Sequence, residues 1–197
     1  MLYAPPAHAR RARDHYSTPV ELARALIGGL SQAGLELPLP IYDPCAGEAA
    51  LLRALDLPGF GSDLYPDEYP PSLWVLETPI DATDVLALSA ALIGEKTSPG
   101  SIVTNPPYGR TAVRVVKAAL ELLDAGQADL VAFLLPLPWE AAGTRLELMR
   151  RLSLRIVCCW RPEWIEGTGG GGKMSSAWLV WTRDPPRFPA TVYESRS

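Results

Sequence analysis

The sequence predicts an α/β fold, with a doubly wound and mostly parallel seven-stranded sheet that has a C-terminal antiparallel hairpin. Short apolar runs alternate with stretches of helical periodicity along most of the chain, which is typical of parallel strands joined by helices. The last two apolar runs have only a glycine-rich loop between them, which favours an antiparallel pair. The length of 197 residues and the 48% hydrophobic content suit one domain with a sizeable core. We therefore expect a single domain over 1–197.

The expected elements follow one another in a regular order. An irregular arm over 1–15 precedes a helix from Pro19 to about Ser31, in which apolar residues recur at helical spacing. Further helices are expected after the first strand and near 85–93, 112–125 and 140–152. Strands are expected at the buried runs 39–43, 58–63, 101–105, 130–136, 154–160 and 177–181. A flexible loop is expected over 160–174.

Composition excludes several classes of protein. No apolar run approaches the roughly 18 residues of a membrane-spanning helix, and prolines interrupt the N-terminal stretch where a signal peptide needs an apolar segment. The three cysteines cannot all pair within the chain, which points to a reducing compartment. His8 and His15 have no acidic or cysteine partner at metal-ligand spacing. We expect a cytoplasmic protein without a metal site or a membrane partner.

The net charge of −4 excludes a uniformly basic surface, but the charge is unevenly distributed. Residues 109–197 carry a net charge of +3, whereas residues 61–108 carry −6. Two clusters of arginines stand out, namely Arg10, Arg11 and Arg13 near the N-terminus and Arg145, Arg150, Arg151, Arg155 and Arg161 near the C-terminus. They are either local patches that hold a polyanion or ordinary solvated side chains.

Polar residues recur at the carboxyl ends of expected strands, the edge of the sheet at which α/β proteins bind ligands. In the turn 43–48, Gly47 lets the backbone approach a ligand at the start of a helix. Asp63 stands about 20 residues later, at a place where an acid accepts hydrogen bonds from ribose hydroxyls. The acidic stretch 81–84 follows. The simpler alternatives are a plain strand-to-helix turn for 43–48 and a turn or cap role for Asp63 and Asp84.

The segment 105–108, Asn-Pro-Pro-Tyr, is harder to explain as a plain loop. Two consecutive prolines cannot continue a helix or a strand ladder, and they hold the backbone stiffly just beyond a buried strand. Such rigidity is useful where the Asn105 amide and a neighbouring carbonyl must be aimed at a ligand.

Together these motifs resemble those of the class I, Rossmann-like S-adenosylmethionine-dependent methyltransferases, and in particular small, phage-like DNA adenine-N6 methyltransferases with an Asn-Pro-Pro-Tyr site. The resemblance extends over nearly the whole chain and implies S-adenosyl-L-methionine as the cofactor. The cofactor site that it implies consists of Tyr16, Thr18, Pro19, Asp43, Cys45, Ala46, Gly47, Asp63, Leu64, Asp84 and Asn105. The catalytic motif that it implies consists of Asn105, Pro106, Pro107 and Tyr108.

This chemistry explains the residue types of the motif. An adenine or amide nitrogen is a poor nucleophile because its lone pair is delocalised. The Asn105 side-chain oxygen and the Pro106 carbonyl are expected to accept both N–H hydrogens, so that the lone pair of the nitrogen points at the sulfonium methyl. Tyr108 offers a ring on which an extruded base can stack. No metal or covalent nucleophile is required.

Substrate contacts are expected from Tyr108, Trp139, Arg161, Trp164 and Lys173. Trp139 is either a wall of the target pocket or a core residue. The loop 160–174 either contacts the substrate or is a plain connection.

The chain departs from the family pattern in two respects. Ala49 stands where the cofactor turn usually has a second glycine, which predicts a slightly weaker fit to the cofactor. No large target-recognition insert fits in the sequence. We therefore expect the recognised target sequence to be short or loosely specified, or the specificity to come from a separate subunit or from a second copy of the chain. Two other functions stay open beside DNA methylation: methylation of RNA bases or of a protein glutamine with the same motif, and a non-catalytic cofactor-binding module.

Overall fold

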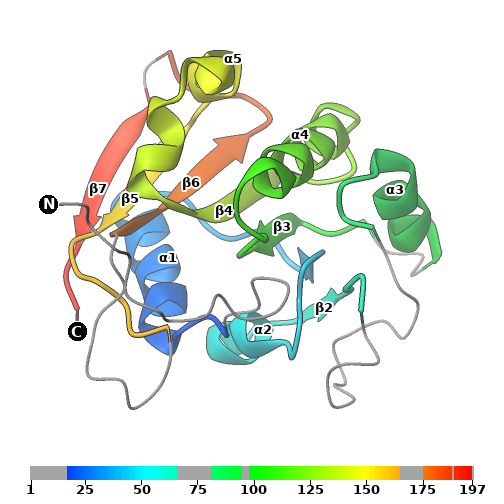
Figure 1. The fold of residues 1–197 in the computed structure, drawn as a ribbon, viewed down its shortest axis with the longest axis horizontal. Coiled ribbons are helices and arrows are strands. Elements are labelled where there is room, and N and C mark those ends of the chain that lie inside the picture. The colour runs from blue at the N-terminus through cyan, green and yellow to red at the C-terminus, as the bar shows by residue number, and fades with distance from the viewer. Residues whose placement is uncertain (1–16, 66–80, 95–97, 165–174, 188, 197) are drawn as a thin grey trace, which may run out of the picture.

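The sheet of this α/β protein lies between two layers of helices (Figure 1). The computed structural model describes residues 17–65, 81–94, 98–164, 175–187 and 189–196. The expected N-terminal arm lies outside these residues, as does most of the expected loop 160–174.

Seven strands in this part of the chain form one sheet in the order β2-β1-β3-β4-β6-β5-β7. They are β1 (Ile41–Asp43), β2 (Gly59–Gly61), β3 (Ser101–Thr104), β4 (Leu130–Pro136), β5 (Leu154–Cys158), β6 (Ser176–Thr182) and β7 (Ala190–Glu194). β6 is antiparallel to both of its neighbours, whereas the other neighbouring pairs are parallel. The predicted class and the antiparallel pair are confirmed. That pair lies inside the sheet, because β6 inserts between β4 and β5 and β7 forms the edge.

Of the described strands, only β7 was not located by the sequence pattern. None of its residues is buried, since each is either half-buried or exposed. β7 therefore lacks the buried apolar run by which the other strands are recognised. β7 is held by its parallel pairing with β5, from Ala190 opposite Leu154 to Glu194 opposite Cys158. An edge strand of this kind is determined by its neighbour and not by its own burial.

The two helical layers cover opposite faces of the sheet (Figure 1). α1 (Val20–Gln32) and α2 (Ala50–Leu55) pack on one face. α3 (Val85–Gly94), α4 (Arg110–Asp124) and α5 (Leu146–Arg150) pack on the other. Trp178 and Trp181 are both fully buried but belong to opposite faces, since they stand three positions apart along β6 and successive side chains of a strand alternate between its faces. None of the described helices is long and apolar enough to cross a membrane.

The prediction of one helix over 140–152 is wrong. Two 3-10 turns, η3 (Leu137–Ala141) and η4 (Gly143–Arg145), precede the short α5 in this region. Ala142 is extended, with φ −78° and ψ 127°, and Gly143 after it has a low helix propensity. Neither η4 nor α5 contains a fully buried residue, and in α5 only Leu148 and Met149 pack, half-buried, against the core.

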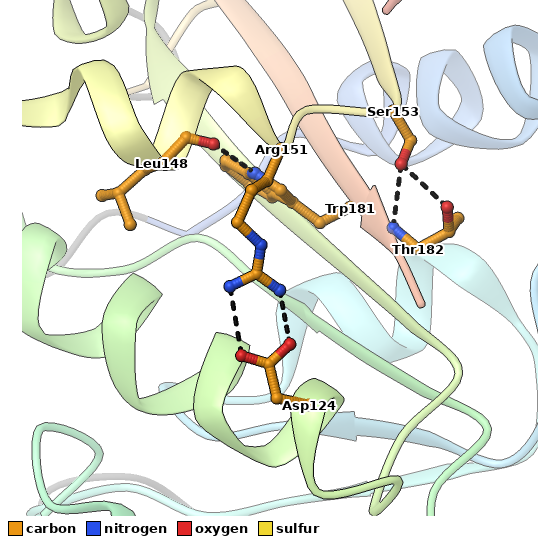
Figure 2. A network of polar contacts seen from close by, with 6 residues as sticks. All are labelled: Asp124, Leu148, Arg151, Ser153, Trp181 and Thr182. Carbon is orange, nitrogen blue, oxygen red and sulfur yellow. Dashed lines mark hydrogen bonds and ion pairs between the residues drawn. The ribbon is translucent and has the colours of Figure 1, made fainter. Parts of the chain in front are cut away.

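Polar contacts attach α5 to the rest of the molecule (Figure 2). Arg151, which follows α5, donates hydrogen bonds to both carboxylate oxygens of Asp124 at the end of α4. Trp181 of β6 donates from Nε1 to the backbone oxygen of Leu148 over 2.9 Å. These contacts tether the segment on the α4 side of the sheet although it buries little surface of its own.

Candidate active site

A cavity opens at the carboxyl ends of β1, β2 and β3, the edge at which α/β sheets bind ligands. Its wall combines the residues before α1, the turns after β1 and β2, the stretch before α3, and the motif that joins β3 to α4. The lining residues are Ser17, Thr18, 43–48, Ala50, Leu51, 63–65, 81–83, 105–108, Thr111 and Val115.

The turn after β1 combines a side-chain bond with an unusual backbone. Asp43 Oδ1 accepts a hydrogen bond from the Cys45 N–H over 3.0 Å. Gly47 and Ala49 have positive φ angles of 52° and 59°, a conformation that suits glycine but strains alanine. Ala49 is fully buried and does not line the cavity. From the sequence we expected alanine at this position to weaken the fit to a ligand. In the structure, the cost of the alanine is instead strain in the backbone of the turn.

Asp63 connects the turns that follow β1 and β2. Its Oδ2 atom accepts a hydrogen bond from the Gly47 N–H over 3.0 Å, and its Oδ1 atom accepts one from the Tyr65 N–H over 2.9 Å. Asp63 thus has the turn role that the sequence allowed. Each carboxylate oxygen has two lone pairs, so Asp63 can also accept hydrogen bonds from a ligand in the cavity that it lines.

Gly61 of β2 allows the turn after β1 to lie against this strand. A Cβ atom at Gly61 would stand 2.5 Å from the Cβ of Ala46 and 3.1 Å from the backbone oxygen of Asp43. Sequence reasoning did not single out this residue. The available signal was a glycine within a short apolar run, which indicates close approach of another backbone.

The Asn105 amide is held by a segment that lies 87 residues earlier in the chain. Its Nδ2 atom donates a hydrogen bond to Thr18 Oγ1 over 3.2 Å, so its Oδ1 atom is the acceptor left for a ligand. Thr18 is 8% exposed, which shields this bond from water. Ser17 donates a hydrogen bond to Glu48 in the turn after β1. Residues 17 and 18 therefore link the two halves of the cavity.

Burial changes the acid–base behaviour of two groups in the wall. Asp43 is 2% exposed, and its burial raises the pKa of the carboxyl to about 7. Burial, together with the nearby Asp43, also raises the pKa of the Cys45 thiol, so this group is protonated at neutral pH and is not a nucleophile. The pKa of Asp81 is lowered, chiefly by hydrogen bonds from Thr83.

The structure brings most of the predicted cofactor and catalytic residues together. Those that line the cavity are Thr18, Asp43, Cys45, Ala46, Gly47, Asp63, Leu64, Asn105, Pro106, Pro107 and Tyr108. Pro19 and Asp84 do not line it. Pro19 caps the start of α1, and Asp84 accepts a hydrogen bond from the Leu86 N–H at the start of α3, which is the cap role allowed by the sequence. Tyr16 lies outside the described residues.

The predicted substrate contacts are more scattered. Tyr108 lines the cavity, whereas Trp139 is 6% exposed in the core cluster beneath α4 and has the Arg145 guanidinium 4.5 Å from its ring. Arg161 is exposed and Trp164 packs against the α1 side of the sheet, and neither lines the cavity. Lys173 lies outside the described residues.

Eleven lining residues were absent from the predicted set. The polar ones and Tyr65 are Ser17, Glu48, Tyr65, Asp81, Thr83 and Thr111, and the others are Pro44, Ala50, Leu51, Ala82 and Val115. Most of the first group adjoin a predicted residue in the sequence, so the motifs located their segments correctly. Thr111 stands in the first turn of α4, shortly after the segment 105–108.

Three of the five arginines in the C-terminal cluster are neutralised by acids. The ion pairs are Arg150–Glu147, Arg151–Asp124 and Arg155–Glu140. The structure therefore favours the alternative of ordinary surface arginines for these three. Among the described residues, no group of three or more His, Cys, Asp or Glu side chains is arranged to hold a metal ion.

Comparison with known proteins gives matches in structure alone. No protein-family model matches the sequence, and no curated protein matches it. A methyltransferase subunit of a type I restriction-modification system from Streptococcus thermophilus matches with a TM-score of 0.60 and 13% identity, over 91% of this chain and 47% of that one. A protein from Listeria monocytogenes described as a class I S-adenosylmethionine-dependent methyltransferase matches with a TM-score of 0.51 and 11% identity, over 94% of this chain and 68% of that one.

The chain has the class I, Rossmann-like methyltransferase fold. It spans about half the length of the restriction-modification subunit. A protein from Lactococcus lactis described as a hemolysin also matches, with a TM-score of 0.56 and 12% identity, over 91% of this chain and 94% of that one. A fold shared at such low identity does not determine the reaction, which depends on the residues of the cavity.

Proposed function

We propose that this protein is an S-adenosylmethionine-dependent N-methyltransferase that acts on the N6 amino group of adenine in DNA. The observation that carries the proposal is the meeting of two sets of residues in one cavity. The segment 105–108 offers acceptors for an amino group, and the acidic turns after β1 and β2 offer partners for a cofactor with ribose hydroxyls. The methyltransferase fold agrees with this combination.

The residues of the cavity fit the cofactor. The Asp63 carboxylate, oriented by two backbone N–H groups, is the proposed acceptor for the ribose hydroxyls. Leu64 and Tyr65 are 43% and 41% exposed beside it and offer apolar surface to a flat ring. When bound, S-adenosylmethionine supplies an electrophilic methyl group on a sulfonium.

Asn105 and Pro106 hold the target amino group in this proposal. The bond from Asn105 Nδ2 to Thr18 orients the amide, so Oδ1 accepts one N–H of the substrate. The backbone oxygen of Pro106 accepts the other. Because the two prolines restrict the backbone, these acceptors need little reorganisation when positive charge develops on the nitrogen. Tyr108 supplies a ring face for an extruded base.

DNA is the proposed substrate for two reasons. The segment 105–108 and its surroundings resemble those of DNA adenine-N6 methyltransferases, and a structural neighbour is named as a subunit of a restriction-modification system. We propose that a separate subunit, or a second copy of this chain, supplies part of the target specificity. A cytoplasmic location is part of the same proposal.

The test is mass spectrometry of nucleosides from unmethylated DNA that has been incubated with the protein and S-adenosylmethionine. We expect N6-methyladenine with the unmodified protein and about 100-fold less with Asn105→Ala, since one aligned acceptor contributes about that factor to a rate. Gln127→Ala is the matched control, because it removes an amide bonded to Ser89 outside the cavity and leaves the activity unchanged.

Other outcomes would overturn the proposal in part or in full. Methylation of RNA or of a protein glutamine, in the absence of methylated DNA, would contradict the DNA assignment and retain the methyltransferase. Absence of cofactor binding in calorimetry would contradict both the DNA assignment and the methyltransferase activity. The remaining candidate would then be a non-catalytic module.

A further inference from the structure

The exposed side of α4 carries three positive charges in a row. Arg110, Arg114 and Lys117 are all exposed. They stand at positions i, i+4 and i+7, so they lie within about 60° of arc on the helix and span about 10 Å along its axis. We refer to these three residues as the α4 basic row.

The α4 basic row forms no ion pair within the described part of the chain, whereas five arginines elsewhere in it do. The ion-paired arginines of the described chain are Arg150, Arg151, Arg155, Arg183 and Arg196. No ion pair joins a side chain of the α4 basic row to another residue that the structure describes. The row ends at the exposed Glu121, one turn further along the same side. Its charge is therefore available to an external anion.

The row also borders the cavity. α4 begins directly after the segment 105–108, and Thr111 and Val115, which each follow a residue of the row in sequence, line the cavity. Arg114 acts on the cavity wall itself. After the hydrogen bonds from Thr83, its positive charge contributes to the lowered pKa of Asp81.

We infer that the α4 basic row binds the phosphates of duplex DNA next to the target base. The inference rests on the proposed function, because it names the contact that brings the DNA substrate to the cavity. One strand of duplex DNA carries a phosphate about every 3.4 Å of axis, so a row about 10 Å long matches about three phosphates. In a chain with a net charge of −4 and an acidic cavity, local positive charge must supply this attraction. Phosphate contacts orient the strand without reading its sequence.

The test compares two variants with the same change in charge. Arg110, Arg114 and Lys117 are replaced together by glutamine in the row variant. Arg24, Arg150 and Arg183, which are exposed and do not line the cavity, are replaced by glutamine in the control variant. Binding of a fluorescent DNA duplex is measured by anisotropy from about 50 to about 200 mM salt. Thermal unfolding and S-adenosylhomocysteine binding show that both variants are folded.

We expect the row variant to bind DNA at least about 10-fold more weakly at the lowest salt, and the slope of log K against log salt to fall in magnitude by about 3. The control variant keeps a slope close to that of the unmodified protein. An unchanged slope in the row variant, or an equal loss in both variants, would overturn the inference even where the protein methylates DNA. Row-dependent binding of RNA without binding of duplex DNA would overturn it as well. If the protein binds DNA through the α4 basic row but methylates no DNA, the proposed function is contradicted and the assignment of the row as a DNA-binding surface is supported.

Discussion

At the scale of single residues, the carboxylates of the cavity act first on the backbone. Asp43 and Asp63 each accept the N–H of the residue two positions later, an Asx turn that determines how the chain leaves a strand. Asp63 also accepts the N–H of Gly47, which connects the two turns. The same side chains therefore shape the turns and line the cavity, so the proposed binding groups are oriented before a ligand arrives.

Replacing Asp63 by alanine tests this double role. We expect cofactor affinity to fall by about 10-fold or more, and the free energy of unfolding to fall by about 1–3 kcal/mol, since two backbone N–H groups lose their acceptor. Calorimetric titration with S-adenosylhomocysteine and denaturant unfolding measure the two effects. Glu36→Ala, at an exposed position away from the cavity, should change neither. Unchanged affinity in Asp63→Ala would contradict the cofactor role.

Thr18 is a positioning residue for Asn105 in the proposed reaction. Thr18→Val keeps the shape of the side chain and removes the acceptor of Asn105 Nδ2, so kcat should fall by about 10-fold while KM for DNA changes little. Thr18→Ser retains the hydroxyl and should restore kcat. Steady-state methylation kinetics measure both constants. A loss of kcat in the serine variant with none in the valine variant would show that the methyl group matters and the hydrogen bond does not.

At the scale of elements, the contact of α1 with the sheet depends on a helical glycine. A Cβ atom at Gly29 would stand 2.5 Å from Ile156 Cγ2 in β5, and both residues are buried. A β-branched side chain inside a strand has little freedom to move aside. Gly29 therefore allows α1 to approach the sheet closely, at the expense of helix propensity.

Gly29→Ala should lower the free energy of unfolding by about 1–3 kcal/mol, because overpacking outweighs the gain in helix propensity. Denaturant unfolding measures the change. Gly143→Ala is the matched control, since no atom lies within 4 Å of the added Cβ and its effect should be small. Combining Gly29→Ala with Ile156→Ala should cost less than the sum of the two changes. Strict additivity would show that the two side chains do not interfere.

At the scale of the whole molecule, burial of Asp43 couples folding to pH. The pKa of this carboxyl is about 7 in the folded protein, against a value near 4 for an exposed aspartate. The folded state therefore binds more protons than the unfolded state between these two values. The stability contributed by the protonated group is fully present below about pH 4, falls as the pH rises to about 7, and is level above that pH.

Urea unfolding at a series of pH values tests this coupling. Between about pH 5 and pH 7 we expect the unmodified protein to lose about 2–3 kcal/mol relative to Asp43→Asn, which keeps Oδ1 for the Cys45 N–H and cannot ionise. The variant should have the flatter profile over this range. Parallel profiles for the two proteins would show that Asp43 ionises normally in the folded state.

The sequence by itself determined the class of the fold and most segments of the cavity, because both depend on local patterns of burial and turn chemistry. The helix predicted over 112–125 corresponds to α4 at Arg110–Asp124, and the segment 105–108 follows a buried strand as expected. Only α5, Leu146–Arg150, forms an α-helix within the range predicted over 140–152, because the chain is extended at Ala142.

Only the tertiary structure decided which distant segments meet. The insertion of β6 between β4 and β5 and the edge position of β7 depend on pairing between strands, which leaves no local signature in either strand. The bond between Asn105 and Thr18 joins residues 87 positions apart. The charges of the α4 basic row stand out only once the ion pairs of five other arginines are located among the described residues. Such contacts arise from packing around the whole sheet, so local periodicity cannot specify them.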